Sequence, residues 1–255
     1  NDAFGAAHRK HTSTAKVAHI LKPAVAGLLM EKEIRCLSQA LDNPTRPFTA
    51  VVGGAKVSSK IGVLENLIDK VDNLIIGGGM AYTFVKANGG KIGNSICEDD
   101  QMDVAKAIEK KAADKGVKLV MATDVLAADD FSGNGTNKVV AINEIPDGFE
   151  GVDAGPESQK AFAEVIKNSK TILMNGPVGA FENPKFAEGT KAVLQAIVDA
   201  TKNGAVSVIG GGDSVSAAKK YFKAEDFTHV STGGGASLEF IEGKVLPGVA
   251  ALDEK

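Results

Sequence analysis

The chain lacks most of the residues that would mark a disulfide-stabilised, membrane-spanning or nucleic-acid-binding protein. Its 255 residues include no Trp, two Tyr and two Cys. Two cysteines, Cys36 and Cys97, are too few for a disulfide framework, so we interpret them as thiols in a reducing compartment. No apolar run approaches the ~20 residues that span a bilayer, and the N-terminus has no apolar signal segment. The net charge of -3 and the scarcity of aromatic rings argue against a nucleic-acid partner.

Glycine, by contrast, is abundant, and it gathers at the ends of apolar runs. Among the 29 glycines are three triplets, at residues 77–79, 210–212 and 233–235, each directly after a short apolar stretch. Stacked glycines between a buried strand and a helix let a ligand approach the backbone. Free amide groups at a helix N-terminus suit phosphates in particular. We therefore expect one anion-binding site built from several loops.

Apolar runs and helical patterns alternate from residue 49 onward. The pattern predicts strands at residues 49–52, 73–76, 118–121, 171–174, 206–209 and 229–231. It predicts helices at residues 26–41, 60–70, 100–115 and 184–202. This alternation indicates an α/β fold with a parallel six-stranded sheet and helices on both faces, in which the glycine loops lie at the ligand-binding carboxyl edge. Residues 131–155, rich in Gly, Asn, Asp and Pro, are expected to be irregular apart from one strand at 139–142.

The standard nucleotide signatures are absent. The dinucleotide fingerprint needs a third glycine at a fixed spacing, but Met80 follows the first triplet and Asp213 follows the second. The Walker motif needs Ser or Thr after Gly-Lys, whereas the two Gly-Lys pairs are followed by Ile92 and Val245. Phosphates must therefore bind in another way, and an NAD-dependent oxidoreductase is disfavoured.

Three segments carry residues suited to phosphate chemistry, and each also has a purely structural interpretation. Asp213 is placed to hold Mg²⁺ at a helix start, or simply to cap that helix. Lys56 and Lys60, one turn apart, can neutralise a polyphosphate or can be ordinary solvated lysines. Asn175 and Glu182 can bond ribose or phosphate, or belong to a turn.

The histidines near the N-terminus do not predict a metal site. His8, His11 and His19 fit no standard zinc spacing, and the cations Arg9 and Lys10 lie among them. Adjacent positive charge opposes metal binding, so this cluster favours an anionic substrate.

Taken in order, these segments closely resemble phosphoglycerate kinases. The matching stretches are residues 1–11, 53–57, 77–81, 175–179, 210–214 and 231–239. The resemblance covers essentially the whole chain. It implies two α/β lobes joined by a hinge, of which the first binds 3-phosphoglycerate and the Rossmann-like second binds the nucleotide.

The resemblance also implies a domain organisation. Residues 1–25 would end the first lobe, 26–41 would form the hinge helix, 42–243 would form the nucleotide-binding C-terminal domain, and 244–255 would be a tail that returns to the first lobe. Because the chain begins with Asn1 rather than Met, we expect a piece of a longer protein. Only remnants of the first α/β lobe would then be present.

Each site residue is assigned by the same resemblance. The expected catalytic residues are Lys56, Gly234, Gly235 and Arg9, and Arg9 would also bind the phosphoglycerate substrate. The expected nucleotide-binding residues are Lys60, Gly78, Gly79, Gly155, Asn175, Glu182, Gly211, Gly212, Asp213 and Ser214. Gly78, Gly79 and Gly155 would frame the adenine, Glu182 would bond the ribose, and Asp213 would also bind Mg²⁺.

The implied reaction is a reversible, Mg²⁺-dependent phosphoryl transfer between 1,3-bisphosphoglycerate and ADP, which gives 3-phosphoglycerate and ATP. The partners would be these small molecules, without nucleic acid or membrane. We expect a monomer in the cytoplasm, with the plastid stroma as the alternative, and a fragment that is inactive without its first lobe. The alternative function is a non-catalytic module that binds an adenine nucleotide.

Overall fold

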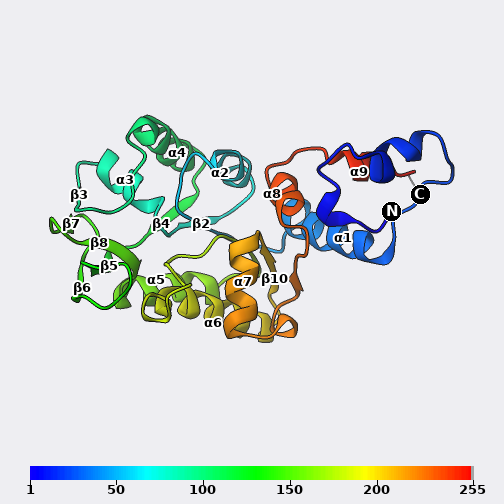
Figure 1. Cartoon of the computed structure of the whole chain (residues 1–255). Coiled ribbons are helices and arrows are strands. Elements are labelled where there is room, and N and C mark those ends of the chain that lie inside the picture. Colours follow the sequence, from blue (N-terminus) through cyan, green and yellow to red (C-terminus); the bar gives the residue numbers. More distant parts are fainter. Residues whose placement is uncertain (254–255) are drawn as a thin grey trace.

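A six-stranded parallel sheet forms the centre of the computed structural model, which describes residues 1–253 (Figure 1). Its strand order is β11-β10-β9-β1-β2-β4, and every neighbouring pair is parallel. The strands are β1 (Phe48–Val52), β2 (Asn73–Ile76), β4 (Lys118–Met121), β9 (Thr171–Asn175), β10 (Val206–Gly210) and β11 (His229–Val230). All six predicted strands are confirmed. The four inner strands are short apolar runs that the sheet buries, whereas the edge strand β4 is half-buried.

Helices cover both faces of this sheet because successive strand residues point to opposite sides. Ala50 and Val52 of β1 pack into one hydrophobic cluster, whereas Val51 packs into the other. The first face is covered by α1 (Leu28–Asp42), α2 (Ile61–Ile68), α3 (Ala81–Ala87), α4 (Met102–Asp114) and α8 (Gly235–Ile241). The second is covered by α5 (Pro156–Lys167), α6 (Glu188–Lys202) and α7 (Gly212–Tyr221). None of the helices within residues 1–253 combines the length and apolar character needed to cross a bilayer.

The four predicted helices are present with shifted ends. They correspond to α1, α2, α4 and α6. The largest shift is at α6, which begins at Glu188 because Pro184–Phe186 form a separate 3₁₀ turn. Asn183 caps this turn, since its Oδ1 accepts from the Lys185 amide at 3.1 Å, and Pro184 at the first position of the turn loses no hydrogen bond within it.

For residues 131–155 the one expected strand, at 139–142, is confirmed as β6 with shifted ends, but the expectation that the rest is irregular was wrong. A second, antiparallel sheet of order β6-β5-β8 is formed by β5 (Asp124–Ala128), β6 (Asn137–Ala141) and β8 (Glu150–Ala154). Beside it lies a two-stranded pair, β3 (Lys91–Ile92) and β7 (Glu144–Ile145). Sequence reasoning found β6 only in part, because it alternates between exposed and half-buried residues, and missed β8, because Glu150, Gly151 and Asp153 interrupt its apolar pattern. Neither has the continuous apolar run of the central sheet.

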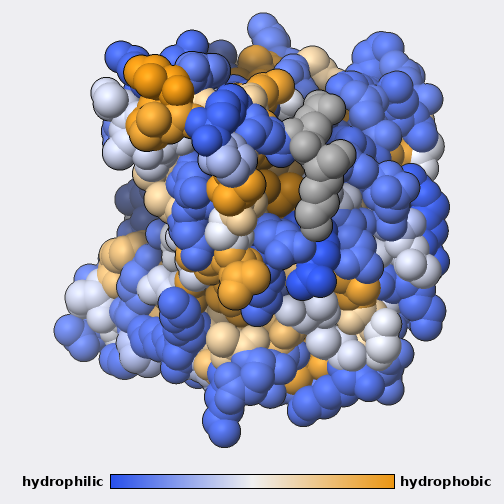
Figure 2. Space-filling view, turned by 90° about the vertical axis from the view of Figure 1, so that its right-hand side faces the viewer, coloured by the Kyte–Doolittle hydropathy of each residue, from blue (hydrophilic) through white to orange (hydrophobic). Residues whose placement is uncertain are grey.

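The two ends of the chain pack together at one end of the molecule (Figure 1). The Gly248 amide, in α9 (Pro247–Ala250), donates to the Ala7 carbonyl at 2.8 Å. The Ala24 amide donates to the Asp253 carboxylate at 2.9 Å. Residues 254–255 of the predicted tail lie outside the described residues. Figure 2 faces this end and shows hydrophobic patches among hydrophilic ones. Exposed apolar side chains of these segments and of the start of α1 are Ile20, Leu21, Val25, Leu28 and Val245.

Glycine lets the loops after β1 and β9 meet backbone to backbone. Gly176 has a φ of +110°, and a Cβ there would lie 2.0 Å from the Gly53 carbonyl oxygen. A Cβ on Gly53 would lie 2.0 Å from the Pro177 carbonyl oxygen. Neither position has room for a side chain, so these two loops have a fixed relative position.

We predict that Gly176→Ala lowers the free energy of unfolding by more than ~3 kcal/mol, because it adds a steric overlap to backbone strain. Gly204→Ala is the matched control: its φ is +89°, but a Cβ there has no atom within 4 Å. The control should lose only ~1–2 kcal/mol from the left-handed backbone. Urea denaturation followed by circular dichroism measures both, and equal losses would contradict the close loop contact.

Candidate functional site

The carboxyl ends of the parallel strands bring the glycine loops to one edge of the sheet. A cavity of about 470 Å³ opens there. This is where open parallel sheets bind their ligands. The cavity is lined by Gly54, Ala55, Gly78, Gly79, Tyr82, Ile96, Phe131, Glu150, Gly151, Val152, Pro177, Val178, Gly179, Ala180, Glu182 and Asp213.

One wall of the cavity is bare backbone. Gly78 has a φ of +70°, and a Cβ there would lie 2.8 Å from both the amide nitrogen and the carbonyl oxygen of Gly54. The Gly78 amide donates to the Val178 carbonyl at 3.2 Å, which joins this loop to the loop after β9. Gly79 continues the wall. A flat ring can therefore lie directly against the peptide groups of this wall.

Lys60 and Asn175 form a polar pair beside this cavity. Lys60 precedes α2, and its Nζ donates to Oδ1 of Asn175 at 2.5 Å. Burial lowers the pKa of Lys60, while the nearby carboxylates of Asp213 and Glu242 act in the opposite direction. The ammonium group is thus partly desolvated and close to Asp213, which lines the cavity.

Asn175 carries an unused hydrogen-bond donor. Its side chain is fully buried, and its Nδ2 has no partner among residues 1–253. A Cβ on Gly211 would lie 3.0 Å from this nitrogen, so the group is directed at the second glycine triplet. A buried donor without an acceptor is destabilising by ~1–3 kcal/mol. An anion held by the Gly211 loop would supply that acceptor.

The second glycine triplet leads directly into α7. Gly211 has a φ of +85°, and a Cβ on Gly212 would meet no atom within 4 Å. Ser214 is fully buried, and its Oγ accepts from the Gly176 amide at 2.5 Å. The open helix start presents amides and partial positive charge to an anion.

Asp213, which the family resemblance expects to bind Mg²⁺, contributes a carboxylate to the cavity. It lies in the first turn of α7 and lines the cavity. Within residues 1–253, no three His, Cys, Asp or Glu side chains form a metal-binding cluster. A cation here would take its other ligands from phosphate oxygens and water, which is how Mg²⁺ usually accompanies a nucleotide.

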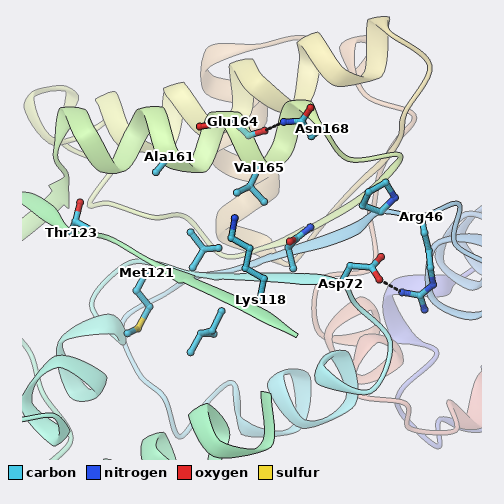
Figure 3. A pocket seen from close by; sticks show the side chains of 13 residues that line it. Arg46, Asp72, Lys118, Met121, Thr123, Ala161, Glu164, Val165 and Asn168 are labelled. Carbon is cyan, nitrogen blue, oxygen red and sulfur yellow. Dashed lines mark hydrogen bonds and ion pairs between the residues drawn. The ribbon is translucent and has the colours of Figure 1, made fainter. Parts of the chain in front are cut away.

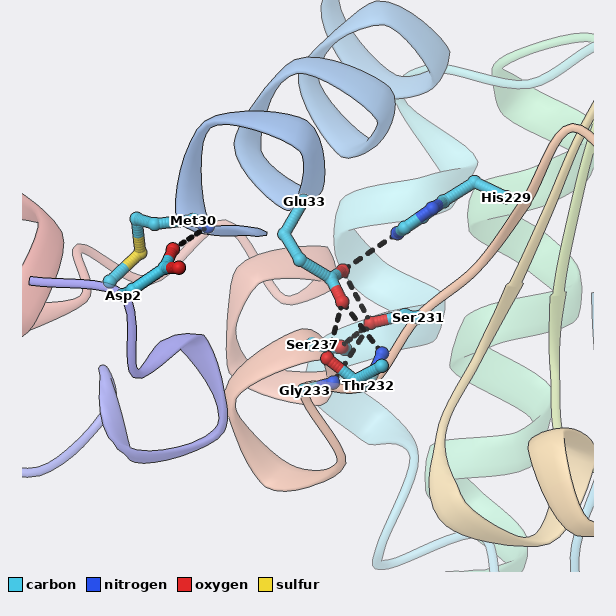
Figure 4. A network of polar contacts seen from close by, with 8 residues as sticks. All are labelled: Asp2, Met30, Glu33, His229, Ser231, Thr232, Gly233 and Ser237. Carbon is cyan, nitrogen blue, oxygen red and sulfur yellow. Dashed lines mark hydrogen bonds and ion pairs between the residues drawn. The ribbon is translucent and has the colours of Figure 1, made fainter. Parts of the chain in front are cut away.

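A buried carboxylate, Glu33 of α1, organises the entry to the third glycine triplet (Figure 4). It accepts hydrogen bonds from His229 Nε2 and Ser231 Oγ, each at 2.8 Å, and from the Thr232 amide at 2.6 Å. Burial opposes its ionisation, but these hydrogen bonds, above all that from His229, keep the pKa of Glu33 below its usual value. The network therefore joins α1 to β11 and the loop after it.

The third triplet and Arg9 lie outside the cavity. The Gly233 amide donates to Ser231 Oγ at 3.1 Å, and Gly234, with a φ of +51°, precedes α8. A Cβ on Gly235 would lie 3.1 Å from His8 Nε2, so the segment that carries Arg9 passes close to this loop. Arg9 and, on the loop after β1, Lys56 are both solvent-exposed.

The structure places Gly155 away from the cavity. Gly155 precedes α5, its amide donates to the Asp124 carbonyl at 2.9 Å, and a Cβ there would lie 2.4 Å from the Asp124 carboxyl carbon. Gly151 and Val152, earlier on the same segment, line the cavity instead. Phe131, an aromatic residue within a polar hairpin, was the only sequence signal for this wall. The cavity residues that sequence reasoning missed include Tyr82, Ile96, Phe131, Glu150 and Gly151.

A larger hollow of about 890 Å³ lies between β4 and α5 (Figure 3). It is reached from the amino ends of β1, β2 and β4, opposite to the glycine loops. Two of its charged side chains, Arg46 and Asp72, form an ion pair with each other at 2.7 Å. No glycine loop contributes to it, so we do not assign the site there.

Asp153 of β8 does not line the cavity, but it contacts the backbone of segments next to the cavity. Its carboxylate accepts from the Gly189 amide at 2.7 Å and from the Ala154 amide at 2.9 Å. Burial raises the pKa of Asp153 to about 7, although these two hydrogen bonds act in the opposite direction. A Cβ on Gly179 would lie 1.9 Å from the same carboxylate, so Asp153 fixes both the start of α6 and the cavity wall.

Comparison with known proteins agrees with this geometry. A family model described as phosphoglycerate kinase matches residues 1–244. The phosphoglycerate kinase of Coxiella burnetii is 46% identical, with a TM-score of 0.94 over 98% of this chain and 64% of its own. That of Pyrococcus horikoshii OT3 is 32% identical, with a TM-score of 0.83 over 99% of this chain and 62% of its own. The chain thus spans less than two thirds of the length of either relative.

The raised pKa of Asp153 makes a prediction about pH. The folded state binds a proton there more tightly than the unfolded state, so this group's contribution to stability falls as pH rises from ~4 to ~7 and is level above that. Between pH 5 and pH 8 the wild-type chain should lose ~2–3 kcal/mol more unfolding free energy than Asp153→Asn. Urea denaturation of both proteins at the two pH values tests this, and parallel pH profiles would refute it.

Glu33→Ala should lower the free energy of unfolding by ~3–5 kcal/mol, because it removes the carboxylate acceptor from the buried side chains of His229 and Ser231. Glu31→Ala, at an exposed position of the same helix, is the control and should change stability by less than ~0.5 kcal/mol. Chemical denaturation distinguishes the two outcomes. A small effect at both positions would show that the network does not stabilise the fold.

Proposed function

The chain belongs to the phosphoglycerate kinase family, and from this we propose that it supplies the nucleotide-binding half of a reversible, Mg²⁺-dependent phosphoryl transfer. The donor and acceptor would be 1,3-bisphosphoglycerate and ADP, and the products 3-phosphoglycerate and ATP. The observation that carries the proposal is the unpaired, buried Nδ2 of Asn175, which points at the Gly211 loop beside Lys60. A polyphosphate would accept a hydrogen bond from this donor and from the amides of the Gly211 loop, and it would pair with the charge of Lys60.

The nucleotide would lie with its base against the glycine wall and its phosphates at the start of α7. We assign Gly78, Gly79 and Gly151 to the base, Glu182 to the ribose, and Lys60 and Asn175 to the phosphates. Gly211 and Gly212 offer backbone amides to the phosphates, and Ser214 holds the Gly176 loop in place. Asp213 would hold Mg²⁺, which neutralises charge on the phosphate oxygens when bound.

No general base is needed for the reaction. In the ATP-consuming direction the nucleophile is a carboxylate, which is already ionised at neutral pH. Catalysis then depends on positioning and on stabilising the charge of the transferred group. We assign this role to Lys56 and to the amides of Gly234 and Gly235, and we assign Arg9 to the phosphoglycerate.

We propose the domain organisation on the same basis. Residues 42–243 would bind the nucleotide, residues 26–41 would form the hinge helix, and residues 1–25 and 244–255 would belong to the substrate lobe. The exposed apolar side chains of Ile20, Leu21 and Val245 support this, because a second lobe would bury them. Closure of the lobes would exclude water from the transferred phosphoryl group. We propose a monomer in the cytoplasm, with the plastid stroma as the alternative.

Isothermal titration calorimetry with Mg-ADP tests the proposal on the chain as it stands. We expect binding that Lys60→Ala weakens ~10-fold or more, because that lysine is desolvated and close to the phosphate site. Lys56→Ala should retain most of the affinity, because its role is in the transfer step. Lys110→Ala, an exposed lysine of α4 paired with Asp114, is the control and should bind normally.

An assay of phosphoryl transfer, with and without the first lobe, provides a second test. Turnover should appear only when the complementary first lobe is added, and Lys56→Ala should then abolish most of it. A folded chain that does not bind Mg-ADP would refute the proposal. Binding without turnover in the presence of that lobe would favour a non-catalytic nucleotide module.

A further inference from the structure

The loop that carries Lys56 is attached to the rest of the molecule through one carboxylate, that of Glu98. Glu98 is half-buried and directly precedes the 3₁₀ turn Asp99–Gln101. Its Oε1 accepts from Ser58 Oγ at 2.6 Å, and its Oε2 accepts from the Ser58 amide at 3.0 Å. Hydrogen bonds to a carboxylate are stronger than those between neutral groups. This pair of bonds therefore fixes the backbone and the side chain of Ser58 together.

The segment that contains Glu98 has its own attachments to the fold. The Glu98 amide donates to Oγ1 of Thr83, a buried residue of α3, at 3.2 Å. Three residues earlier, Ser95 Oγ accepts from the Gly151 amide of β8 at 2.9 Å. A helix and the second sheet thus hold this segment, so the backbone of Glu98 is a fixed point for the loop after β1.

The contact with Ser58 does not serve to cap α2. That helix begins at Ile61 with Lys60 as its N-cap, so the Ser58 amide is not one of the free amides at the helix start. Ser58 lies instead in the turn that the Lys60 amide closes by donating to the Val57 carbonyl at 2.8 Å. Glu98 therefore holds the loop itself.

The same turn determines where Lys56 lies. Its carbonyl accepts from Ser59 Oγ at 2.8 Å, and the next residue, Val57, is completely buried. The side chain of Lys56, by contrast, is solvent-exposed. The reach of its ammonium group toward a ligand thus depends on where the turn holds its backbone, and Glu98 fixes that turn two residues away.

We propose that Glu98 is a positioning residue for Lys56 in phosphoryl transfer. The inference rests on the proposed function, which assigns Lys56 to the transferred group. A displacement of ~1 Å in a catalytic group can lower a rate by ~100-fold. Glu98 is not among the residues that line the cavity, so its loss should affect the transfer step and spare nucleotide binding.

The test measures turnover of the chain with its first lobe, and Mg-ADP affinity by calorimetry. Glu98→Ala should lower turnover ~10-fold and change the affinity by less than ~2-fold. Ser58→Ala should lower turnover less, because the Ser58 amide still donates to Glu98. Asp100→Ala is the matched control, since this exposed carboxylate of the same segment accepts from the neighbouring Gln101, and it should change neither quantity.

The same substitution in a Lys56→Ala chain separates positioning from a general structural role. A residue that acts through Lys56 has little left to lose there, so Glu98→Ala should lower the residual turnover by less than ~2-fold. A purely structural role predicts the same ~10-fold loss in both chains. Equal losses would overturn the inference, as would unchanged turnover or an equal loss of Mg-ADP affinity in Glu98→Ala.

Amide hydrogen exchange of the free chain gives a measurement that does not depend on activity. Glu98→Ala should speed exchange of the Ser58 amide ~10-fold or more, because its acceptor is removed. Unchanged exchange would also overturn the inference. Absence of turnover in the wild-type chain with its first lobe would overturn the proposed transfer, and this inference with it.

Discussion

The carboxylate of Glu33 is the contact on which the arrangement of the site depends most. It is completely buried, yet it is ionised, because donors from β11 and the following loop surround it. A buried charge of this kind tolerates little displacement, since each lost hydrogen bond leaves a donor and an acceptor unpaired and out of reach of water. Helix α1 and the third glycine loop therefore hold a fixed relative position. A change in the tilt of α1 would therefore displace the start of α8.

The three glycine triplets share a composition but serve different physical needs. Gly78 is glycine because another peptide group occupies the space of a side chain. Gly211 combines a left-handed backbone with a close approach to Asn175. Gly234 has the left-handed backbone alone, with open space around it. The first forms a wall, and the other two expose amides at a helix start, so one residue type builds a single site in three ways.

The central sheet could be predicted from sequence because parallel strands are buried on both faces and appear as unbroken apolar runs. Of the second sheet only β6 could be predicted, and only in part, because its burial alternates, while β8 contains a glycine and two acidic residues. The same difficulty affects the cavity at the carboxyl edge of the central sheet. Gly151 and Gly155 are four residues apart in one segment, and only the fold shows that Tyr82 packs on the first and Asp124 on the second. Tyr82 belongs to no local sequence motif, because Gly151, the residue that it packs against, lies on a strand about 70 residues away in sequence.

The pairing of the two chain ends has a mechanical consequence. The amide of Gly248 bonds the carbonyl of Ala7, so the first and last segments form one small body. Two separate segments join that body to the sheet, namely α1 and the link that follows α8. Phe4 and Ala7 of this body also lie in the main hydrophobic cluster, together with residues of α1 and α8. The body is therefore packed against these helices as well as joined to them, so a shift of the paired chain ends would displace the start of α8.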